Sequence, residues 1–160
     1  MVDMPVEEIT PPLDAEALLS GAQFVDAFRI GIGDRQLDAR QAAIQMIEHG
    51  PRWIDALMRL RNLLVTPFGL KTPRPDAASA GDSIGIFPVR SETPQRIVAG
   101  FDDHHLDFRV VIDVEGAAAG RHVVASTLVR THNLLGRTYL ATIMPFHRLV
   151  VQAMLRRLAT

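Results

Sequence analysis

The sequence predicts an α+β fold in which a curved antiparallel sheet packs around a long C-terminal helix. Short segments of alternating apolar and polar residues fill most of residues 84–131, and residues Arg137 to Ala159 then follow with the apolar spacing of a helix. Two shorter helical segments precede this series of strands and follow an earlier strand. Because an amphipathic helix must bury its apolar stripe, and the strands offer the only large apolar surface, we expect the last helix to lie across the sheet.

The composition is that of one globular domain. The chain has 160 residues, a formal net charge of −1 and no cysteine. This length suits a single domain with a full hydrophobic core, so we expect residues 1–160 to fold as one unit. The balanced charge gives no reason to expect nucleic acid as a partner, and the lack of cysteine excludes disulfides and thiolate metal sites.

The N-terminus carries no export signal by the usual criteria. Residues 1–10 contain acidic side chains and lack both a basic start and an apolar run. No apolar stretch of the chain is long enough to span a bilayer. We therefore expect a cytoplasmic location and no membrane span.

The first half of the chain predicts one strand followed by two helices. Residues Phe24 to Ile30 alternate as a strand does, after one or two helical turns at Asp14 to Leu19. Asp38 has Gln41 three residues later, which is the spacing of a capping box and predicts the start of a helix.

A glycine and a proline separate the two predicted helices. Gly50 suits the end of the first helix, and Pro51 suits the first turn of the second. The second helix has one apolar stripe, made of Trp53, Leu57, Leu60 and Leu64. Lys71 to Asp82 is rich in Pro, Ala, Gly and Ser, which predicts a long mobile loop.

Four further strands bring the predicted number to five. They are Ile84 to Arg90, Arg96 to Phe101, Leu106 to Val114 and His122 to Thr131. Apolar rows of the last two strands meet only if an even number of residues connects the strands. This requirement predicts that Asp113 and His122 lie on the same face of the sheet, and it places them directly opposite each other.

The C-terminal helix holds the most distinctive candidate residue, His147. Nearly half of the helix surface is apolar, and Pro145 falls on the polar side, where a proline bends the helix without breaking it. His147 lies near the middle of the apolar arc. Two interpretations stay open: a core histidine bonded to one structural partner, or a histidine that lines a cavity as a base or hydrogen-bond donor.

Several segments, in the order in which they occur, resemble an uncharacterised bacterial domain family. They are Pro51-x-Trp53, residues 57–62 (Leu-Met-Arg-Leu-Arg-Asn), Phe68-Gly69-Leu70, residues 105–109 (His-Leu-Asp-Phe-Arg), Leu135-Gly136-Arg137 with Tyr139, and Pro145-Phe146-His147-Arg148. Members are single small proteins or are appended to reductases of the NAD-dependent epimerase type. The family is similar to the helix-grip superfamily of polyketide cyclases, lipid-transfer domains and plant ligand-binding proteins.

This resemblance implies a helix-grip-like fold. In that superfamily a strand comes first, two short helices follow, a meander continues, and a long C-terminal helix closes over a pocket. The order of elements predicted above is the same, although the superfamily usually has seven strands and the sequence predicts five. The resemblance also implies a reductase as a candidate partner. The family has no established activity, so the resemblance assigns no role to any residue.

The densest group of potential metal ligands is Asp102-Asp103-His104-His105-x-Asp107. Neighbouring strand residues point to opposite sides, so only His105, Asp107 and Arg109 share a face, and the guanidinium among them favours an ion pair over a metal. The chain has no nucleophile elbow and no dinucleotide-binding loop. We therefore expect no metal site and no cofactor.

Three functions are compatible with these features. The first is a binding module that holds a small apolar or amphipathic molecule between the sheet and the last helix, with His147 or Arg109 as its polar contact. The second is a cyclase-like or dehydratase-like enzyme, with His147 as acid or base and Asp107 orienting it. The third is an interaction domain of a reductase. The sequence leaves open the ligand and whether the chain forms a homodimer. The apolar walls expected for the pocket are Trp53, Phe101, Phe108, Phe146 and Met154.

Overall fold

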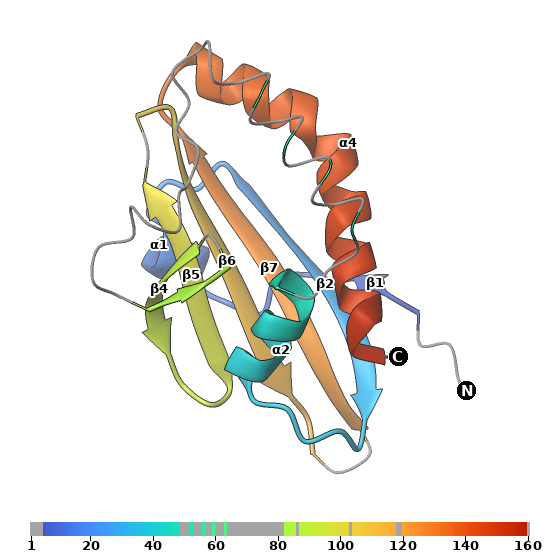
Figure 1. Cartoon of the computed structure of the whole chain (residues 1–160). Coiled ribbons are helices and arrows are strands. Elements are labelled where there is room, and N and C mark those ends of the chain that lie inside the picture. The colour runs from blue at the N-terminus through green and yellow to red at the C-terminus, as the bar shows by residue number, and fades with distance from the viewer. Residues whose placement is uncertain are drawn as a thin grey trace.

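A computed structural model describes residues 5–48, 52, 56, 59, 63, 82–85, 87–102, 104–117 and 120–159. Within these residues, seven strands form one antiparallel sheet in the order β1-β2-β7-β6-β5-β4-β3 (Figure 1). The predicted α+β class, with a curved antiparallel sheet and a long last helix, is confirmed. The strands are β1 (Glu7–Glu8), β2 (Phe24–Gly33), β3 (Ser83–Ile84), β4 (Phe87–Glu92), β5 (Arg96–Asp102), β6 (Leu106–Glu115) and β7 (Arg121–Thr131).

The two longer helices begin at polar caps. In α2 (Ala39–Ile47), both hydrogen bonds of the predicted capping box between Asp38 and Gln41 are present. The last helix, α4 (Leu134–Arg156), starts three residues before the predicted position, because the side chain of Asn133 accepts a hydrogen bond from the backbone N–H of Gly136. A short helix, α1 (Ala15–Leu18), precedes β2, and a 3₁₀ turn, η4 (Arg157–Ala159), follows α4.

Part of the predicted second helix and the predicted mobile loop cannot be compared with the structure. Trp53 and its apolar stripe lie outside the described residues, and so does the loop apart from Asp82. Arg52, Ala56, Arg59 and Leu63 are described, each with helical backbone. No helix among the described residues combines the length and the apolar character needed to cross a membrane.

Different helices cover the two sides of the sheet (Figure 1). On the first, which we call the α4 side, α4 packs against β2 and β7, and α2 packs against β5 and β6. The main core lies there and includes Phe28, Ile112 and Leu155, all almost fully buried. On the other, which we call the α1 side, Leu19 and Val111 belong to a smaller core beside α1. The predicted docking of the last helix on the sheet is therefore confirmed.

The connection between β6 and β7 has the predicted parity, but the exact register differs. Glu115 pairs with His122, which leaves the six residues 116–121 between them. Asp113 and His122 share a side of the sheet, as predicted, but Asp113 lies opposite Val124. The strands pair two residues further toward the turn than predicted, and Glu115 and His122 form an ion pair of 3.1 Å at that end of the ladder.

The predicted number of five strands is wrong for two local reasons. The single strand predicted at Ile84 to Arg90 is a hairpin, since Gly85 takes a φ of +58° and the chain reverses between β3 and β4. The edge strand β1 has only two residues, too few for any alternating pattern.

Candidate functional site

The strand register aligns residues on the α4 side into rows that cross the sheet. Burial falls from one row to the next, toward the end of the sheet where α4 begins. The innermost row is sealed by α2 and the C-terminal half of α4, whereas the aromatic members of the outermost row are only half-buried. From the innermost outward, the rows are Phe28-Ala125-Ile112-Ile97, then Asp26-Thr127-Val110-Ala99, then Phe24-Val129-Phe108-Phe101.

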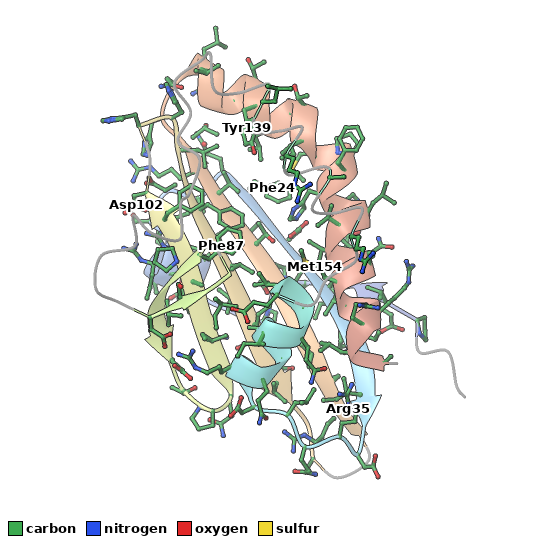
Figure 2. All side chains as sticks on the ribbon, viewed as in Figure 1. Phe24, Arg35, Phe87, Asp102, Tyr139 and Met154 are labelled. Atoms are coloured by element: carbon green, nitrogen blue, oxygen red, sulfur yellow. The ribbon has the colours of Figure 1, made fainter. Side chains whose placement is uncertain are left out.

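Three phenylalanines from neighbouring strands form an aromatic cluster on this side. The rings of Phe87 and Phe101 are stacked with centroids 6.3 Å apart, and the ring of Phe108 is tilted against them at 5.4 and 5.9 Å. All three side chains are half-buried. Figure 2 shows Phe87 in front of the sheet, on the side that carries α4. The structure thus brings together two predicted wall residues, Phe101 and Phe108, and adds Phe87.

His147 reaches from α4 to the sheet and bonds Asp26. Its Nε2 lies 3.2 Å from Oδ2 and 3.5 Å from Oδ1 of that carboxylate. The side chain of His147 is 17% exposed and Asp26 is 8% exposed, so the two groups meet in a largely buried place. The ring of Phe24 approaches His147 edge-on, with centroids 6.0 Å apart. We call these two residues the His147–Asp26 pair.

This geometry assigns the hydrogen on the imidazole. An ionised carboxylate only accepts hydrogen bonds, so Nε2 of His147 carries the hydrogen that Asp26 accepts. In the neutral ring, Nδ1 is then an acceptor. With a neutral ring, Nδ1 is therefore the acceptor atom of the pair, and the carboxylate of Asp26 on β2 holds the ring in position.

Asp26 is the functional candidate that sequence reasoning missed. Its signal was present, since Asp26 falls on the apolar face of its strand, between Phe24 and Phe28. Acidic residues are almost never fully buried without a partner, so a carboxylate at a core position indicates a buried polar contact.

The structure does not bring Asp107 to His147. Asp107 lies on the α1 side, where its Oδ1 is 3.0 Å from Nε2 of His132. Odd-numbered residues of β6 point away from α4, so the predicted role of Asp107 in orienting His147 is wrong. The carboxylate that bonds His147 is that of Asp26.

Arg109 is also on the α1 side and is buried. Its Nη1 lies 2.8 Å from Oδ1 of Asp102 and donates to the backbone carbonyls of Phe101 and Phe108. The hydrogen bond from Arg109 also lowers the pKa of Asp102 below its ordinary value. The predicted role of Arg109 as a polar contact in the same pocket as Phe108 is wrong, because adjacent strand residues point to opposite sides.

The remaining predicted wall residues differ in position. Phe146 is 51% exposed, because one residue along a helix turns the side chain by about 100° away from His147. Met154 packs against the main core, and Figure 2 shows it between α4 and the sheet. Trp53 lies outside the described residues.

The potential metal ligands near the start of β6 contact other groups. Asp102 pairs with Arg109, and Nδ1 of His105 lies 2.9 Å from Nδ2 of Asn133. Among the described residues, no group of three or more histidine and acidic side chains is placed to hold a metal ion.

Two open hollows in the described part of the chain lie elsewhere. One of about 260 Å³ is beside β1 and is lined by residues that include Glu7 and His122. The other, of about 290 Å³, is beside the start of α2 and is lined by residues that include Asp38. Neither hollow includes a predicted site residue, a member of the aromatic cluster or Asp26. We define the candidate site by the half-buried aromatic row and the His147–Asp26 pair.

Comparison with known proteins identifies the family. Residues 18–154 match the family model DUF2867, described as a protein of unknown function. No curated protein and no solved structure matches the chain. The matched span is well over half of the chain and includes both Asp26 and His147. The chain therefore belongs to the DUF2867 family.

Proposed function

We propose that this chain, as one domain, binds a small apolar or amphipathic molecule on the α4 side of the sheet, between α4 and β4. The observation that supports the proposal is the half-buried aromatic row beside a buried histidine–carboxylate pair. Ligand sites are typically lined by apolar and aromatic side chains with a few fixed polar groups. The order of elements predicted from the sequence resembles that of the helix-grip superfamily, whose last helix closes over a pocket, and this resemblance supports the proposal.

The size of the surface supports a small ligand. Asp26 on β2 and Phe108 on β6 are separated by one intervening strand, β7. Neighbouring strands lie about 4.8 Å apart, and Asp26 and Phe108 are also offset by two residues, about 7 Å along the strands, so these two residues are about 12 Å apart. A molecule of two or three fused rings spans that distance.

A catalytic role for the same site is the second candidate, because Asp26 bonds His147 in the way that a carboxylate orients a general acid or base. In a cyclase-like or dehydratase-like enzyme, His147→Gln would abolish turnover, whereas in a carrier it would leave ligand binding largely intact. A sealed core with His147 bonded to a backbone carbonyl would favour the accessory role beside a reductase, whereas His147 bonds the side chain of Asp26.

Introducing a charge into the aromatic row tests the binding role. We expect Phe101→Asp to weaken the binding of N-phenyl-1-naphthylamine, an uncharged fluorescent probe, by at least about tenfold, because an unpaired carboxylate would face the apolar ligand. The measurement is a fluorescence titration, with circular dichroism to verify folding.

The matched control is Leu149→Asp, which makes a similar change at a side chain that is 60% exposed on α4. It should bind the probe as the unmodified chain does. Equal loss of binding in both variants, or no binding by the unmodified chain, would contradict the proposed site.

A further inference from the structure

The hydrogen bond within the His147–Asp26 pair limits which polar group of a ligand could bond the pair. Asp26 is bonded through Nε2 of His147, so Nδ1 is the ring atom left to meet a ligand. In the neutral ring this atom accepts a hydrogen bond. With a neutral ring beside an ionised carboxylate, the pair has a net charge of −1, which does not attract an anion.

Arg148 follows His147 on α4, and its guanidinium already has other partners. Arg148 forms an ion pair with Glu8 of β1, and its guanidinium lies 5.7 Å from the centre of the Phe28 ring. More than half of the Arg148 side chain is exposed, on the side of α4 that faces β1. A carboxylate ligand would therefore gain no cationic partner from these residues.

We infer that the ligand is a flat, uncharged molecule whose hydroxyl group, such as that of a phenol or an enol, donates a hydrogen bond to Nδ1 of His147. This inference rests on the proposed function, since it names the ligand class of the same site. The aromatic cluster contacts the ring system about 12 Å from the pair. Aromatic side chains pair favourably with a flat ring in stacked or tilted arrangements.

Three naphthalenes distinguish the hydroxyl from its alternatives. We expect 2-naphthol to bind the unmodified chain about fivefold more tightly than 2-methoxynaphthalene, and more tightly than 2-naphthoate, in fluorescence titrations. A fivefold ratio corresponds to one ordinary hydrogen bond. A purely apolar surface gives the opposite order for the first two, because the methyl ether has more apolar area to bury.

Two variants locate the effect at the pair. In His147→Leu the preference for 2-naphthol over its methyl ether should disappear, since the acceptor is removed. If that variant fails to fold, Asp26→Asn, which keeps the shape but no longer fixes the ring hydrogen on Nε2, should reduce the ratio toward one.

The outcomes separate the two proposals. If 2-methoxynaphthalene or 2-naphthoate binds at least as tightly as 2-naphthol, the inferred ligand class is wrong while the binding function stands. A preference for 2-naphthol that persists in both variants would also overturn it. If none of the three compounds binds, the proposed function fails and the ligand class fails with it.

Discussion

Gly100→Ala is expected to destabilise the chain by more than about 3 kcal/mol or to prevent folding. Gly100 has a φ of +149°, a conformation that essentially only glycine adopts and that costs another residue on the order of 1–3 kcal/mol. A Cβ at this position would also overlap the carbonyl oxygen of Phe108 and lie 3.0 Å from Cα of Arg109. Neither group can yield, because both belong to the backbone of β6.

The damage would reach the candidate site, since Gly100 precedes Phe101 and lies opposite Arg109 in the ladder. Separating β5 from β6 there would part Phe101 from Phe108. The measurement is equilibrium unfolding in urea. Gly120→Ala is the control, because a Cβ there meets nothing within 4 Å, and it should change the free energy of unfolding by less than about 0.5 kcal/mol. A Gly100→Ala variant within about 1 kcal/mol of the unmodified chain would show that the strands can adjust.

His147→Leu is expected to lower the free energy of unfolding by about 2–3 kcal/mol. The substitution removes the hydrogen-bond donor of the His147–Asp26 pair and leaves a carboxylate that is 8% exposed. A buried charge without its partner is costly. The double variant Asp26→Val with His147→Leu should recover most of this loss, because replacing both members by apolar groups is often nearly neutral.

A second histidine–carboxylate pair provides the control for this cycle. His122 and Glu115 are 3.1 Å apart, but their side chains are 26% and 40% exposed. Exposed pairs contribute little, so His122→Leu should cost less than about 1 kcal/mol. If the double variant at the site is no more stable than His147→Leu alone, the two side chains are not coupled and the pair does not define the site.

Much of the fold is predictable because its signals are local. The capping box of Asp38 and Gln41 needs only neighbouring residues, and period-two alternation fixes which side of β6 a residue faces. The exact register of β6 and β7 is harder to predict from the sequence. Asp113 and Glu115 are two residues apart, so pairing either of them with His122 gives the same sides. The choice between the two pairings depends on the energy of the closing turn.

Of the two residues of the His147–Asp26 pair, only His147 was predicted from the sequence, because only its signal is local. His147 stands out as a polar residue in the apolar arc of one helix, and that arc is visible in a short window of sequence. Its partner Asp26 is 121 positions away, and only the topology brings the two together. Because β2 pairs with β7, the first long strand lies under α4. Without that pairing, Asp107 is an equally acceptable carboxylate by residue type, and it points to the other side.

The position of a bound molecule can be measured by adding 2-naphthol to the ¹³C- and ¹⁵N-labelled chain and following assigned chemical shifts. Saturable changes are expected at His147, Phe101 and Phe108, with Val111 and Leu128 on the α1 side unchanged. Changes confined to the α1 side or to the outer surface of α4, with His147 and Phe108 unaffected, would contradict a binding site on the α4 side of the sheet.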